Sequence, residues 1–172
     1  MEAGDGESGE LIVGRPLIPG YGVPESDEGM LAWSHVTGRL EQARNYWICT
    51  AGPDGQPHAV PVWGAWLDGA LYFGVGPRSA RNLTTNPKVA VHLESGDDVV
   101  ILEGSVGQMQ GPDPALSQRL DDAMADKYGW RPSEEGAEEA VGEGWYVLHP
   151  RTVYAWASFP QDATRWKLAP VG

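Results

Sequence analysis

The sequence predicts a mainly β fold, an antiparallel barrel with a few helices. A series of short segments is rich in aromatic and β-branched residues, and turn signals such as Gly52-Pro53-Asp54-Gly55 and Asp68-Gly69 separate them. Helical periodicity occurs at only a few places between these segments. A doubly wound sheet would instead alternate strand and helix throughout, so a mostly antiparallel barrel is favoured.

The first half of the chain is expected to form one helix and two hairpins. From about residue 28 to 44, apolar side chains recur at spacings of three and four, as in an amphipathic helix. Residues 45–51 form a strand that turns at Gly52-Pro53-Asp54-Gly55 into a second strand over 56–67. The Asp68-Gly69 turn then leads into a strand over 70–75.

The second half mixes strands with two helices. A short helix over 79–85 ends before Asn86-Pro87, and Gly104 and Gly107 mark a bulge of the kind that closed sheets use at corners. The other expected elements are strands at 88–93 and 99–109, a helix at 114–128, a flexible acidic run at 131–144, and strands at 145–149, 152–158 and 164–168.

Size and charge limit the classes of protein. The 172 residues, 41% of them hydrophobic, predict one domain over 28–172, preceded by a flexible arm over 1–27 that is rich in Gly, Pro and acids. The net charge of -12 argues against nucleic-acid binding. No long apolar run suits a membrane span, and the acidic N-terminus is unlike a signal peptide, so we expect a cytoplasmic protein that does not bind membranes.

A basic, glycine-containing loop carries the main functional signal. It follows the strand over 70–75 and opens the short helix, where backbone amides and the helix dipole favour an anion. A dinucleotide-binding fold is excluded, because the helix is too short for a βαβ crossover and two hairpins precede it. The residues expected to hold the anion are Arg78, Ser79, Arg81 and Asn82, although Asn82 can equally serve only its local backbone.

Taken in order, these motifs resemble a known family. The pattern is a PDG turn, the strand PHAVPVWGAW, an LDG turn, the strand ALYFGV, and then S-x-R-N-L-x-x-N-P-K-V-x-V. It is similar to the FMN-binding split β-barrel superfamily, the pyridoxamine 5′-phosphate oxidase-like proteins. It looks closest to the B branch of the flavin/deazaflavin oxidoreductases, many of which use coenzyme F420. The resemblance implies a split β-barrel and a homodimer with cofactor clefts between its subunits.

The resemblance also implies a set of cofactor-binding residues. His58 stands where related oxidases place an arginine, and Ser79 stands where a lysine is common, so the anion site carries less positive charge than a standard FMN site. We therefore expect F420, with FMN as the alternative. The cofactor ring would lie along Val60, Pro61, Val62 and Trp63, and the phosphate would be held by Arg78, Ser79, Arg81 and Asn82.

Three functions remain open. The leading one is an F420-dependent oxidoreductase that transfers a hydride to a small unsaturated or heteroaromatic substrate. The alternatives are an FMN-dependent oxidase or reductase and a non-catalytic flavin- or haem-binding module.

No metal site is expected, because the four histidines lack metal-binding spacing. Trp63 and Trp66, three apart on an expected strand, should face opposite sides, with one of them in the core.

Overall fold

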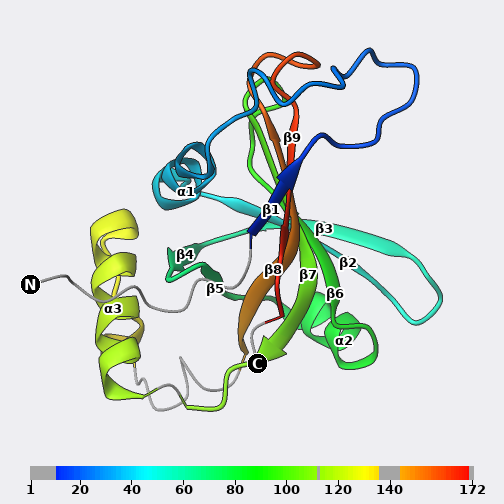
Figure 1. Ribbon diagram of the computed structural model, residues 1–172. Coiled ribbons are helices and arrows are strands. Elements are labelled where there is room, and N and C mark those ends of the chain that lie inside the picture. Colours follow the sequence, from blue (N-terminus) through cyan, green and yellow to red (C-terminus); the bar gives the residue numbers. More distant parts are fainter. Residues whose placement is uncertain (1–10, 112, 136–143, 171–172) are drawn as a thin grey trace, which may run out of the picture.

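The computed structural model describes residues 11–111, 113–135 and 144–170. Its strands form one antiparallel sheet, in the order β1-β9-β8-β7-β6-β2-β3, with β5 paired to β8 and β4 paired to β5 (Figure 1). The split β-barrel fold class is thereby confirmed. The elements are β1 (Leu11–Gly14), α1 (Trp33–Gln42), β2 (Tyr46–Ala51), β3 (Pro57–Val62), β4 (Gly64–Leu67), β5 (Ala70–Gly74), α2 (Pro77–Thr85), β6 (Lys88–His92), β7 (Val99–Gln108), α3 (Pro114–Tyr128), a 3-10 turn (Pro132–Glu135), β8 (Trp145–Trp156) and β9 (Thr164–Leu168).

The sheet divides at the middle of β8. One edge of β8 pairs with β7 throughout, while the other edge pairs first with β5, up to Leu148, and then with β9, from Thr152. At this division the register shifts beside Gly104, which lies opposite Pro150. Of the two glycines predicted to mark a bulge or bend, Gly104 lies at the register shift, whereas Gly107 pairs in regular register with Val147. The prediction of two strands over 145–149 and 152–158 is wrong, because a bulge lets a strand continue through a proline.

The predicted strand over 56–67 is also wrong as a single element. It breaks at Trp63 into β3, which pairs with β2, and β4, which pairs with β5. Both predicted hairpin turns are confirmed by the strand pairing. Asp68 and Gly69 have positive φ angles of 51° and 77°, as a tight two-residue hairpin turn requires.

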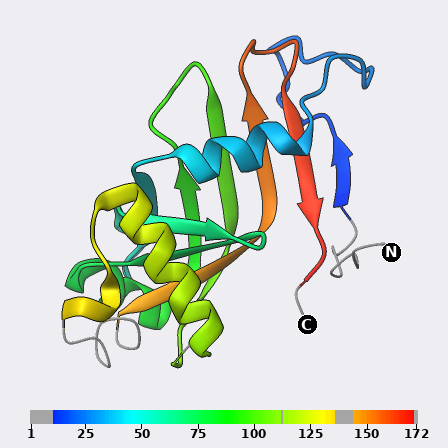
Figure 2. The same cartoon turned by 90° about the vertical axis from the view of Figure 1, so that its left-hand side faces the viewer.

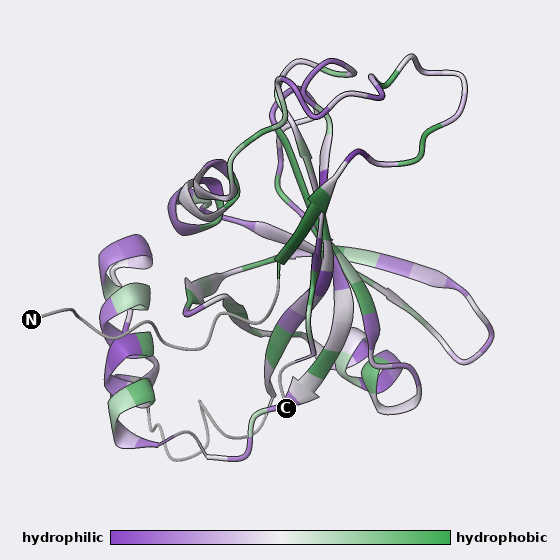
Figure 3. Cartoon of the chain, viewed as in Figure 1, coloured by the Kyte–Doolittle hydropathy of each residue, from purple (hydrophilic) through white to green (hydrophobic). Residues whose placement is uncertain are grey.

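Two helices cover one face of the sheet. Figures 1 and 2 show α1 and α3 on the same side, with the β4–β5 hairpin beneath them. Alternate side chains of this hairpin point into two apolar clusters: Leu71 and Phe73 join the main core, and Ala70 and Tyr72 join a second cluster under α3. Both helices show polar and apolar residues together, as amphipathic helices do (Figure 3). No helix among the described residues is long and apolar enough to cross a membrane.

The remaining helix, α2, is anchored to β2 by a buried hydrogen bond. The Asn82 side-chain amide donates to the Thr50 hydroxyl at 3.0 Å, and both side chains are almost fully buried. Leu83, the next residue along α2, packs into the main core. This contact fixes α2 against the same side of β2 that faces the core.

The N-terminal segment adds a strand that the sequence did not predict. β1 pairs with β9. The Arg15 guanidinium donates hydrogen bonds to four backbone carbonyls, two in the segment before α1 (Ser26 and Glu28) and two in the segment before β9 (Gln161 and Ala163). The division predicted between residues 27 and 28 stays a prediction, and residues 1–10 lie outside the described part of the chain. Residues 136–143, which contain most of the predicted acidic run, also lie outside the described part.

Replacing Gly104 with Ala should destabilise the fold. An added Cβ would lie 2.9 Å from Leu148 Cδ1 and 3.0 Å from the His149 carbonyl oxygen. We expect a loss of about 1–3 kcal/mol in the free energy of unfolding, measured by denaturant titration. In the control, Gly107→Ala, the nearest atom is at 3.9 Å, and we expect little change or a slight gain. Equal losses in the two variants would contradict this account of the bulge.

The Asn82–Thr50 contact can be tested by a double-mutant cycle. Asn82→Ala and Thr50→Val should each cost about 1–3 kcal/mol, because each can leave a buried polar group without a partner. The double variant should lose less than the sum, with a coupling energy of about 1 kcal/mol. Additive losses in denaturant unfolding would mean that this hydrogen bond does not hold α2.

Candidate functional site

The predicted ring-binding residues lie on an edge strand. β3 is the last strand of the sheet path and pairs only with β2 in the described part of the chain. Two prolines, Pro57 and Pro61, lie on β3, and proline suits an edge strand because it has no backbone N–H to donate. The outer edge of β3 is therefore open to a ligand or to another chain.

The side chains of β3 alternate between two faces. His58, Val60 and Val62 are half-buried on the face directed toward the core, and Pro61 lies on the opposite face. The register places His58 opposite Thr50, the residue to which α2 is anchored. Residues directly opposite on neighbouring strands have Cβ atoms about 5 Å apart, so His58 lies next to α2.

The start of α2 has the features of an anion site. Gly76 precedes the helix and makes no side-chain capping bond, and Pro77 has no N–H, so the first amides of the helix point outward without a cap. Arg78 and Arg81 are exposed, while Ser79 is only 1% exposed. The Ser79 hydroxyl has no hydrogen-bond partner within the described residues. The structure thus brings His58 and the predicted anion-binding residues to one place.

The predicted residues nevertheless divide by role. Asn82 uses its side-chain amide to bind the Thr50 hydroxyl, 32 residues away, and not its local backbone as the alternative expectation had it. The side chains of Arg78 and Arg81 have no ion-pair partner among the described residues. Positive charge at this site is therefore available to a ligand.

Trp63 lies at the bend between β3 and β4. Its side chain is 44% exposed, while Trp66 is 6% exposed in the main core, which confirms that one of the two tryptophans is a core residue. One face of the Trp63 ring stacks on Tyr128, with ring centroids 4.5 Å apart and planes 9° apart. The Arg44 guanidinium carbon lies 5.9 Å and 5.6 Å from the two rings.

Tyr128 is a residue of this region that the sequence reasoning missed. Its hydroxyl accepts a hydrogen bond from the Gly64 backbone N–H at 3.0 Å and donates to the Arg44 carbonyl at 2.8 Å. These contacts join the end of α3 to the bend, across 64 residues of sequence. No local pattern reports such a contact, so only the tertiary structure reveals it.

The two ends of β3 carry different chemistry. His58 and α2 lie at one end, and Trp63 lies at the other, five residues away. At about 3.3 Å per residue the separation is roughly 16 Å. This edge can hold a long, flat ligand, with an anionic group at α2 and an aromatic ring near Trp63.

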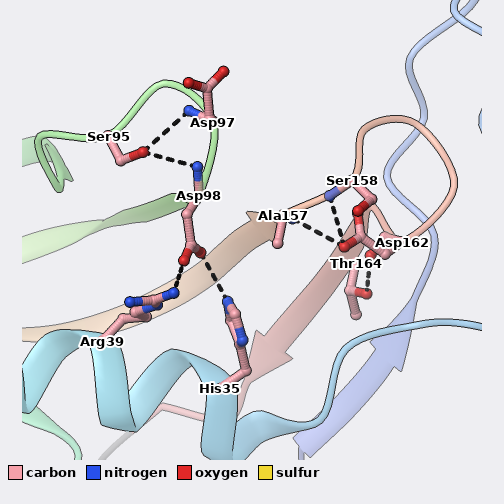
Figure 4. A network of polar contacts seen from close by, with 9 residues as sticks. All are labelled: His35, Arg39, Ser95, Asp97, Asp98, Ala157, Ser158, Asp162 and Thr164. Carbon is pink, nitrogen blue, oxygen red and sulfur yellow. Dashed lines mark hydrogen bonds and ion pairs between the residues drawn. The ribbon is translucent and has the colours of Figure 1, made fainter.

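Two cavities lie apart from the predicted site residues. One, of about 370 Å³, is bordered by α1, the segment that joins α1 to β2, and the β6–β7 loop, and its wall includes Asp98. Asp98 binds Arg39 and accepts from His35 Nε2 at 3.0 Å, which ties this loop to α1 (Figure 4). The other cavity, of about 350 Å³, lies between α1, β4 and α3. No group of three potential metal ligands occurs in the described part of the chain.

Comparison with known proteins agrees with this architecture. A conserved hypothetical protein of Mycobacterium tuberculosis is 22% identical, with a TM-score of 0.60 over 76% of this chain and 88% of the other. A haem-binding protein of Mycobacterium smegmatis is 16% identical, with a TM-score of 0.59 over 81% and 59%. A putative 5-nitroimidazole antibiotic resistance protein of Bacteroides thetaiotaomicron is 12% identical, with a TM-score of 0.59 over 98% and 96%.

At these identities the likeness establishes the fold alone. No curated protein matches the chain by sequence. The model of one family, described as pyridoxamine 5′-phosphate oxidase, does match, over residues 33–157. This span contains the β2–β3 hairpin, the bend at Trp63, α2 and the whole of β8. The chain therefore belongs to the pyridoxamine 5′-phosphate oxidase family.

Proposed function

We propose that the protein is an oxidoreductase that binds a phosphorylated flavin or deazaflavin along β3, with F420 favoured over FMN. The observation that carries the proposal is the start of α2. There, within the described part of the chain, the buried Ser79 hydroxyl has no hydrogen-bond partner, the helix end has no side-chain cap, and two arginines have no ion-pair partner. Backbone amides at such a helix end and free guanidinium groups both favour a phosphate. These residues fit the anionic end of either cofactor.

The choice of F420 rests on the charges at this end. His58 and Ser79 stand where the resemblance leads one to expect an arginine and a lysine, which leaves Arg78 and Arg81 as the main charges. Both arginines are exposed, so their attraction for an anion is weakened by solvent. Such a site suits a loosely held anion better than the closely bound phosphate of FMN.

The other end of β3 supplies the surface for the ring. Trp63 is held on one face by Tyr128 and leaves its other face exposed, and the β3 edge leaves backbone groups open beside it. When bound, the cofactor would supply a hydride for an electrophilic carbon of a small unsaturated or heteroaromatic substrate. The protein's part is to orient the two rings and to exclude water.

A homodimer would complete the cleft. One row of register-matched side chains crosses four strands on the sheet face opposite the core: Trp47, His92, Ile101 and Tyr154. All four are only half-buried. We propose that a second copy covers this face and closes the cofactor cleft beside β3.

The second candidate is a module that binds haem without catalysing a reaction. His92 Nδ1 lies 2.8 Å from the Leu93 carbonyl oxygen, which can only accept, so Nδ1 carries the hydrogen. Nε2 of the neutral ring then keeps its lone pair, as an axial haem ligand requires. His92 also stacks on Trp47, with the ring planes 1° apart.

Binding measurements separate these functions. F420, FMN and haem should each be titrated into the same apo protein, with F420 followed by its fluorescence. We expect F420 to bind most tightly and haem least. Arg78→Gln with Arg81→Gln should weaken F420 binding about tenfold or more, because two charge-assisted contacts are lost.

The control for this variant is Arg119→Gln, which removes a charge from α3, where Arg119 pairs with Asp68 at the β4–β5 turn. It should leave the F420 affinity within about twofold. Equal effects of the α2 and α3 variants would contradict a specific anion site. Tight haem binding that His92→Ala abolishes, with no binding of F420 or FMN, would favour the second candidate.

A further inference from the structure

A half-buried lysine lies beside the bend between β3 and β4. Lys127, near the end of α3, donates from Nζ to the Tyr46 hydroxyl at 2.8 Å and to the Gly64 carbonyl at 3.4 Å. Nζ also lies 5.1 Å and 5.8 Å from the ring centroids of Tyr46 and Tyr128. Phenol groups and a carbonyl thus surround this amine.

The amine has no carboxylate partner among the residues that the structure describes. None of the ion pairs between described residues includes Lys127. Tyr46 donates its own hydrogen to the Leu40 carbonyl at 2.5 Å, so its oxygen faces Lys127 as an acceptor. Burial lowers the pKa of Lys127 to about 8, and Glu41 on α1 opposes this shift only in part. The Tyr46 and Tyr128 hydroxyls do not compensate, because burial raises the pKa of both and keeps them neutral.

Lys127 also lines the cavity of about 350 Å³ between α1, β4 and α3. Two hydrogen bonds, to Tyr46 and Gly64, use two of the three positions on Nζ. The third position holds a proton in the ammonium form and the lone pair in the neutral amine. The cavity wall is part apolar and part acidic: Ala65, Trp66 and Ala123 are apolar, and Glu41, Gln42 and Asp126 are polar or acidic.

We propose that Lys127 is a nucleophilic amine that forms an imine with small uncharged aldehydes entering this cavity. The neutral Nζ attacks the carbonyl carbon and the C=O π bond breaks. Nζ then loses one proton and the oxygen takes one up, directly or through solvent, which gives a neutral carbinolamine. Loss of water then leaves a C=N bond to Nζ. The step needs no oxidant or reductant, and it is independent of the cofactor site.

The charges of the cavity set the class of carbonyl compound. Glu41 and Asp126 both line it, and neither forms an ion pair within the described residues. Like charges at a few ångströms repel, so an anionic aldehyde is disfavoured. The apolar wall formed by Trp66 and the two alanines suits a short uncharged chain.

The chain contains its own controls. It has three lysines, and Lys88 and Lys167 are exposed. At pH 7 an amine of pKa about 8 is about 10% neutral, whereas an ordinary lysine of pKa 10.4 is about 0.04% neutral. Propionaldehyde should be added to the intact protein with cyanoborohydride, which traps imines, and each lysine should be quantified by peptide mass spectrometry.

We expect Lys127 to be labelled at least about tenfold faster than Lys88 and Lys167 at pH 7, with its rate rising through pH 8 and then levelling. The preference should shrink when glyoxylate, an anionic aldehyde, replaces propionaldehyde. Glu41→Gln, an exposed substitution, should raise the Lys127 rate at pH 7 and restore labelling by glyoxylate. Equal rates for the three lysines, or a Lys127 rate that still rises steeply above pH 9, would overturn the proposal.

Discussion

The structure depends on one constraint: β7 and β8 must approach closely at a bulge where β8 changes its second partner. Gly104 has no side chain there, which leaves room for Leu148 and for the backbone of β8. Before this point β8 pairs with β5 of the β4–β5 hairpin. After it β8 pairs with β9, which in turn pairs with β1. The division creates the space beneath α1 and α3 that the hairpin fills (Figure 2).

The placement of the hairpin in turn sets the bend at Trp63. β3 continues the main sheet, whereas β4 turns away to pair with β5, so the chain bends sharply between them. The bend leaves the Trp63 side chain 44% exposed and stacked on Tyr128, and it brings Gly64 against Tyr128 and Lys127. One break in a strand thus places Trp63, at the end of the proposed cofactor edge, near the residues that surround Lys127.

The sequence predicted what local signals determine. Turn residues located both hairpins, and periodicity gave the bounds of α3 without error. Gly104 was identified as a bulge from the glycine alone. The continuous β8 was missed because Pro150 normally ends a strand, and β1 was missed because it exists only by pairing with β9. Strand continuity and pairing are tertiary properties that a local pattern does not contain.

In the candidate site, too, local signals were readable from the sequence and tertiary contacts were not. An anion at the start of α2 and a cofactor ring along the strand that contains Val60 were predicted from the basic loop and from the family resemblance, and both stay predictions. Ser79 was predicted as a ligand, but its buried hydroxyl without a partner is visible only in the structure. Tyr128 and Lys127 reach the bend from α3, and the burial that lowers the pKa of Lys127 depends on three separate elements.

The central claim is that a flavin-class cofactor lies along β3 with its phosphate at the start of α2. Hydrogen–deuterium exchange of the protein with and without F420 tests this claim most directly. The account predicts slower exchange of the Arg78 and Ser79 amides and of β3 when F420 is bound, with β1 and β9 unchanged. Protection confined to α1 and α3, with the start of α2 exchanging as before, would contradict it.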